Sequence, residues 1–106
     1  MSMASPTPSE EPVIASISGF EWSSEESVAY EAAIEAINGA VGAYSARIHA
    51  EQGKESPDSS LLARLLEEQG QCARAREQLV PTDHAQIAEA RTHYADLARR
   101  LLEEAP

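Results

Sequence analysis

The spacing of large apolar side chains between residues 30 and 48 constrains the fold of this chain more than any other feature. These side chains recur at intervals of four, three, four, three and four residues: Tyr30, Ile34, Ile37, Val41, Tyr44 and Ile48. That period places all of them along one face of an α-helix. The pattern therefore predicts one long amphipathic helix whose apolar seam is buried against a neighbour.

A second stripe, made of alanines, runs beside this seam. Its members are again three or four residues apart: Ala29, Ala33, Ala36, Ala40 and Ala43. Small side chains let a neighbouring helix come close, so we expect this helix to pack on two sides. It should begin at Ser23 or Ser24, with Ser23 and Glu26 as a capping box, and end near Gln52, before Gly53. The two glycines in its middle weaken it by about 1 kcal/mol each, but the seam continues through them.

A second helix is expected from about Ser60 to Leu79. Asp58 or Ser59 can cap its start, and Pro81 stops it because the residue before a proline avoids the helical region. Its second half is polar and contains Gly70. A break at this glycine would turn the helix into two short ones, and the sequence leaves both arrangements open.

A third seam predicts the last helix, with Thr82 or Asp83 as its cap. The apolar positions are three and four residues apart: Ile87, Ala90, Tyr94, Leu97 and Leu101. Three amphipathic helices with short connections predict an all-α fold, an antiparallel three-helix bundle over residues 23–106. A break at Gly70 would make it four short helices.

Residues 1–22 are expected to form a flexible acidic arm outside this bundle. The first twelve residues combine Ser, Thr, Pro and Glu without an apolar period, which is typical of disorder. Residues 13–22 form a short apolar motif that either packs onto the bundle or awaits a partner. The chain starts without the basic and apolar regions of a signal peptide, and no apolar run is long enough for a membrane span. We therefore expect a cytoplasmic location.

The net charge of −10 is unevenly distributed. The chain up to Ala46 carries no Lys or Arg and seven acids: Glu10, Glu11, Glu21, Glu25, Glu26, Glu31 and Glu35. Such a field repels nucleic-acid phosphates and anionic lipids, so neither is an expected partner. It favours a basic protein surface, although an acidic surface also keeps a small protein in solution. Seven Arg against one Lys, with abundant Ala, is typical of a GC-rich bacterial genome.

Catalytic and metal-binding patterns are missing from the sequence. The single cysteine, Cys72, falls on an apolar helix face and is interpreted as a small buried side chain. His49, His84 and His93 form no His-x-x-x-His pair of the kind that binds zinc. Neither a nucleophilic-serine motif nor a phosphate-binding glycine loop occurs. We expect a protein that is not an enzyme and that needs no cofactor or metal.

These features favour a non-enzymatic protein-interaction module, such as an adaptor, an inhibitor of the antitoxin or immunity type, or a regulatory subunit. The residues expected to bind a basic protein partner come from the apolar motif and the first helix: Ile17, Phe20, Trp22, Glu25, Glu26, Glu31 and Glu35. A homodimer is a further expectation, because the first helix has more apolar surface than one neighbour needs.

The alternative interpretation is a small-ligand carrier. Tyr30, Tyr44 and Tyr94 all occupy seam positions and would line a pocket between the helices. The competing explanation of the same residues is that each ring packs in the core and its hydroxyl reaches the boundary.

Overall fold

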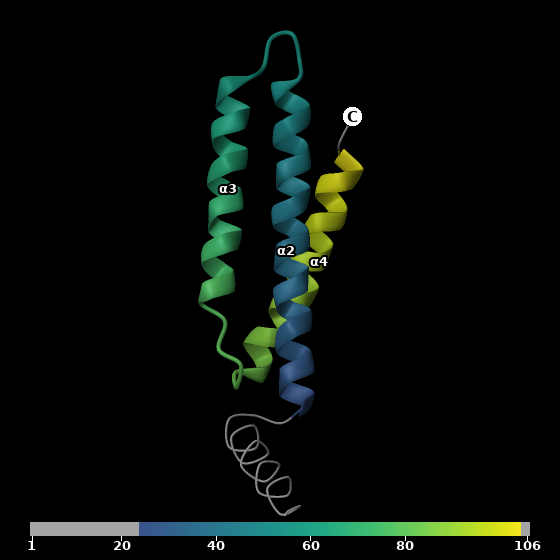
Figure 1. The fold of residues 1–106 in the computed structure, drawn as a ribbon, viewed down its shortest axis with the longest axis vertical. Coiled ribbons are helices and arrows are strands. Elements are labelled where there is room, and N and C mark those ends of the chain that lie inside the picture. Colours follow the sequence, from purple (N-terminus) through teal and green to yellow (C-terminus); the bar gives the residue numbers. More distant parts are fainter. Residues whose placement is uncertain (1–23, 105–106) are drawn as a thin grey trace, which may run out of the picture.

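The computed structural model describes residues 24–104, and within that range the regular structure is entirely helical. The helices are α2 (Ser24–Gln52), α3 (Ser59–Glu77) and α4 (His84–Glu104). Figure 1 shows α2 between the other two, with α3 running against its direction and α4 running along it. The predicted all-α three-helix bundle is confirmed. The predicted arm, residues 1–22, lies outside the described residues.

The central helix, α2, is buried on two sides, as its two stripes predict. Ile37 is 0% exposed, and Tyr44 and Ile48 of the same seam are buried. Three members of the alanine stripe are buried as well: Ala33, Ala40 and Ala43. α2 packs against both α3 and α4, whereas no Cα atom of α3 lies within 8 Å of one in α4. The bundle is therefore organised around α2.

Two apolar clusters hold the helices together. The larger one combines residues of all three helices: Ile37, Ala40, Ala43, Tyr44, Ile48, Leu65, Cys72 and Leu101. The smaller one joins the N-terminal half of α2 to α4 through Ala33, Ile87 and Ala90. Burying a side chain the size of Ile37 contributes about 1.5–3 kcal/mol, so these clusters are the main source of stability. Small residues at both contacts keep α2 and α4 close.

Helix α3 runs without interruption through Gly70, so the alternative of four short helices is not realised. Glycine at this position weakens a helix by about 1 kcal/mol. This cost is smaller than the free energy gained by burying Leu65 and Cys72, which lie on either side of the glycine in the sequence. The helix ends at Glu77, two residues earlier than Leu79, and the backbone N–H of Gln78 closes it on the Arg74 and Ala75 carbonyls.

Asp58 and Asp83, each among the predicted caps, hold the starts of α3 and α4. The carboxylate of Asp58 accepts hydrogen bonds of 3.0 and 3.1 Å from the backbone N–H groups of Ser60 and Leu61, in the first turn of α3. Asp83 accepts one of 3.1 Å from the N–H of Gln86. The Gln86 side chain reaches back across the α3–α4 connection, where it accepts from the Val80 N–H at 2.7 Å and donates to the Gln78 carbonyl at 3.2 Å. These local bonds fix the two turns.

Candidate interaction surface

The acidic residues expected to bind a partner lie on the N-terminal half of α2. Glu25, Glu31 and Glu35 are exposed, and Glu26 is partly buried. At 1.5 Å per residue, the three exposed carboxylates extend over about 15 Å of helix. No Lys or Arg occurs in α2 before Arg47. Ile17, Phe20 and Trp22, the other residues of the expected site, lie outside the described residues.

Glu26 has a second role that the sequence did not reveal. Its carboxylate contacts Nε2 of His84, the first residue of α4, and so connects the N-terminal ends of two helices. In the expected capping box, the partner of Glu26 is Ser23, which lies outside the described residues. The two contacting residues are 58 positions apart. Since the contact depends on how α4 is placed beside α2, no local pattern indicates it.

A shallow groove follows the junction of α2 and α4 and begins at the first turn of α2. Three adjoining hollows make it up, and they are lined by residues of α2, α4 and Pro81, with none from α3. The hollow between Glu26, His84 and Ile87 has a volume of about 220 Å³. We call this groove the α2–α4 trough and define it by six of the residues that line it: Ala29, Ala32, Ala36, Ala88, Arg91 and Ala95.

Alanines and carboxylates line the trough, together with one arginine. Glu25, Glu26 and Glu35 line it from α2, whereas Arg91 is its single lining Lys or Arg side chain and borders all three hollows. Within residues 24–104, Arg91 makes no ion pair. Val28, beside the trough on α2, is 69% exposed. A groove lined by alanines, carboxylates and one arginine thus lies open next to the start of the described chain.

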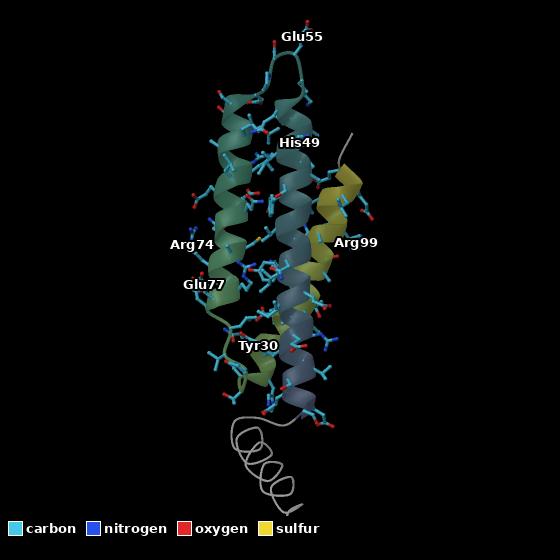
Figure 2. All side chains as sticks on the ribbon, viewed as in Figure 1. Tyr30, His49, Glu55, Arg74, Glu77 and Arg99 are labelled. Carbon is cyan, nitrogen blue, oxygen red and sulfur yellow. The ribbon has the colours of Figure 1, made fainter. Side chains whose placement is uncertain are left out.

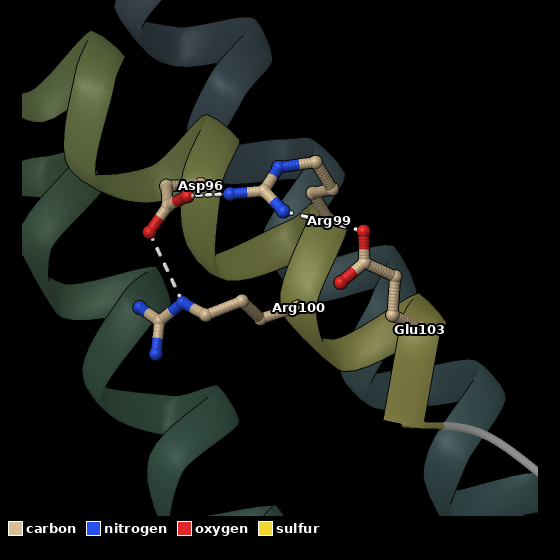
Figure 3. Close-up of polar contacts among 4 residues, drawn as sticks. All are labelled: Asp96, Arg99, Arg100 and Glu103. Atoms are coloured by element: carbon tan, nitrogen blue, oxygen red, sulfur yellow. Dashed lines mark hydrogen bonds and ion pairs between the residues drawn. The ribbon is translucent and has the colours of Figure 1, made fainter.

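The arginines at the end of α4 are paired with acids of their own helix (Figure 3). Arg100 Nε lies 3.0 Å from Asp96 Oδ2, and Arg99 contacts both Asp96 and, at 3.2 Å, Glu103. Burial by itself would raise the pKa of Asp96, but the two guanidinium groups hold that pKa below its ordinary value. Since neighbouring acids offset these charges, α4 does not present the clustered bases that would follow a phosphate backbone.

The three seam tyrosines pack in the apolar clusters. Tyr44 is buried in the larger cluster, Tyr94 packs against both, and Tyr30 packs against the smaller one. The hydroxyl of Tyr44 donates a hydrogen bond of 3.1 Å to Glu68 on α3. Burial and this bond to a carboxylate raise the pKa of Tyr44 to about 12. Tyr44 is therefore a core tyrosine, whereas Tyr94 also lines a hollow between the end of α3 and α4.

No set of three His, Cys, Asp or Glu side chains within the described range converges to hold a metal ion. His93 is exposed and meets the Tyr94 ring edge-on, with 4.7 Å between ring centroids. Cys72 is buried, as expected, and burial followed by the nearby Glu68 carboxylate raises its pKa. The protonated thiol, rather than the nucleophilic thiolate, is therefore the form present at neutral pH.

None of the helices of residues 24–104 combines the length and the apolar character that crossing a bilayer requires. No protein-family model, no curated protein and no solved structure matches this chain.

Proposed function

We propose that this chain is a non-enzymatic interaction module whose acidic α2 surface binds a basic protein. Modules of this kind serve as adaptors, as inhibitors of the antitoxin or immunity type, or as regulatory subunits. The observation that carries the proposal is the exposure of Glu25, Glu31 and Glu35 along one helix that has no base before Arg47.

Two carboxylates of this surface make no ion pair with another described residue, although Arg91 lines the adjoining trough. Glu31 and Glu35 lie one helical turn apart, and neither makes an ion pair with any residue between 24 and 104. The acids at the end of α4, such as Glu103 and Glu104, are paired with arginines. Uncompensated carboxylates steer a positively charged partner and speed its association, and this effect weakens as salt is added.

The surface is also preformed. α2 is held between α3 and α4, so its carboxylates are presented by a helix that is already folded. A rigid binding surface loses little conformational entropy on association. The same arrangement covers the seam and much of the alanine stripe within one chain, which supports the monomer as the binding unit. Sedimentation at high concentration that shows a dimer would argue for the homodimer instead.

The test is a pair of charge reversals compared in a pull-down from the native host with quantitative mass spectrometry. The test variant carries Glu31→Lys and Glu35→Lys. The control carries Glu55→Lys in the α2–α3 turn and Glu77→Lys at the end of α3, both exposed (Figure 2). Both variants change the net charge equally. We expect about tenfold weaker capture of a basic protein by the test variant alone, and weaker capture by the wild type at higher salt.

Equal losses in the two variants would show that overall charge, rather than the α2 surface, governs binding, and full capture by the test variant would contradict the proposal. A second variant lacks residues 1–22. We expect it to keep the helical circular dichroism signal of the bundle while capturing less partner. Unchanged capture would remove Ile17, Phe20 and Trp22 from the binding surface.

A further inference from the structure

The α2–α4 trough has no covering element among residues 24–104, and alanines make up part of its lining. These alanines come from two helices, and Val28 of α2 is 69% exposed. From Ser24 to Ala36 the trough follows α2 for about 18 Å. Alanines recur along this length between polar side chains, so the trough is long enough to accept a short chain segment.

The segment with the right chemistry is attached to one end of the trough. Ser24 lines the hollow at that end, and residues 13–22 precede it by a single residue. This segment contains five large apolar side chains: Val13, Ile14, Ile17, Phe20 and Trp22. After a reversal at residues 21–23, the eight residues 13–20 would reach about 26 Å when extended. They can therefore run the full length of the trough.

We propose that residues 13–22 dock in the α2–α4 trough of their own chain. Residues 13–20 carry no charged side chain, so the carboxylates that line the trough do not repel them. The only charge in the segment is Glu21, and the trough has a single Arg, Arg91, to receive it. The rings of Phe20 and Trp22 can also stack on that guanidinium.

Because residues 13–22 are covalently attached to the bundle, weak contacts are sufficient to keep them docked. A short linker gives an effective concentration on the order of 1 mM. A docking constant of about 0.1 mM would then leave roughly nine chains in ten docked. Docking stands independently of the proposed function, but it would place Ile17, Phe20 and Trp22 beside Glu25 and Glu35. The two halves of the expected partner site would then form one continuous surface.

The experiment uses Trp22, the only tryptophan of the chain, as a reporter in the full-length protein. Acrylamide quenching of its fluorescence measures how far solvent reaches the ring. We expect the quenching constant of the native protein to be roughly half that of a free peptide of residues 13–23, and independent of protein concentration. A constant equal to that of the peptide would overturn the proposal. Shielding that appears only as concentration rises would assign the trough to a second copy and would also overturn it.

Two variants test whether the trough is the surface that shields Trp22 from acrylamide. Ala88→Gln fills the trough at an exposed position that borders two of its hollows, and Ala63→Gln makes the same change at an exposed position of α3. We expect only Ala88→Gln to raise the quenching constant toward the peptide value. Equal constants in the two variants would overturn the proposal.

Circular dichroism verifies that both variants fold. If Ala88→Gln does not, the double variant Ile17→Ser and Phe20→Ser tests the contact from the other side, with the same expected rise. Unchanged quenching in that variant would overturn docking. The quenching measurements use the protein without any partner. A failed docking test can therefore be distinguished from a failed pull-down.

Discussion

The carboxylate of Glu51, at the end of α2, accepts a hydrogen bond of 2.9 Å from the backbone N–H of Asp58, the residue that caps α3. Its other oxygen lies 2.9 Å from the ammonium group of Lys54. Glu51 is only 6% exposed, although it is charged and lies next to a solvent-exposed turn. One side chain thus connects the end of one helix, the turn and the start of the next.

Replacing Glu51 should destabilise the α2–α3 turn. Glu51→Ala leaves the Asp58 N–H without its acceptor, so we expect the melting temperature to fall by several degrees. Glu55→Ala, at an exposed position in the same turn, should change it little. Lys54 and the Asp58 N–H hold the pKa of Glu51 below its ordinary value. Its contribution is therefore present above the ordinary pKa and lost as pH falls through the lowered one.

Thermal melts followed by circular dichroism at neutral pH and at about pH 3 test both statements. The difference between wild type and Glu51→Ala should shrink at acid pH. Equal melting temperatures for Glu51→Ala and Glu55→Ala at neutral pH would show that the bridge does not stabilise the turn.

Ionisation of Tyr44 should weaken the fold at high pH. Its folded-state pKa of about 12 lies above the ordinary value of 10.0, so the neutral phenol stabilises the native state. That contribution is fully present below the ordinary pKa and is lost as pH rises from about 10 to 12, at a cost on the order of 2–3 kcal/mol. The Tyr44→Phe variant should have a free energy of unfolding about 1 kcal/mol lower than wild type near pH 8. Its stability should depend less on pH.

Urea denaturation at several alkaline pH values, with wild type and Tyr44→Phe in parallel, measures this difference. Parallel decreases in stability for the two proteins would show that other groups, and not Tyr44, cause the alkaline loss.

Truncating the central core residue should cost more stability than any exposed change. Ile37→Ala removes a side chain that is 0% exposed and packed in the larger cluster, and we expect a loss of about 2–5 kcal/mol. Val28→Ala, on the same helix but 69% exposed, should cost about 0.5 kcal/mol or less. Chemical denaturation measures both. Similar losses would contradict the assignment of Ile37 to the core.

Two helical glycines should be replaceable with a gain in stability. A Cβ at Gly42 would meet nothing within 4 Å, and one at Gly70 would meet only the flexible end of Arg74 at 3.4 Å. Alanine at either position should stabilise the protein by about 0.5–1 kcal/mol. Gly53→Ala, just beyond the end of α2, should gain less. Destabilisation by Gly70→Ala would indicate that α3 bends at this position.

The amino-acid sequence by itself determines where the helices of this protein form. The seams of α2 and α4 and the caps Asp58 and Asp83 depend on residues within a few positions of each other, so local spacing is enough to predict them. Continuity at Gly70 is not decided locally, because a penalty of about 1 kcal/mol favours neither outcome clearly. The burial of Leu65 and Cys72 against the rest of the bundle decides it.

For the candidate surface too, the sequence predicts one part and the tertiary structure decides the rest. The sequence shows the excess of acids before Arg47, but it does not show which contacts these acids make in the folded protein. Glu26 meets His84 across 58 positions, Gln69 bonds to the Val41 carbonyl across 28, and the α2–α4 trough exists only because two helices lie side by side. These contacts depend on the rotation and offset of each helix relative to α2. Packing of small and large side chains in the tertiary structure sets those quantities, and helical periodicity alone does not contain them.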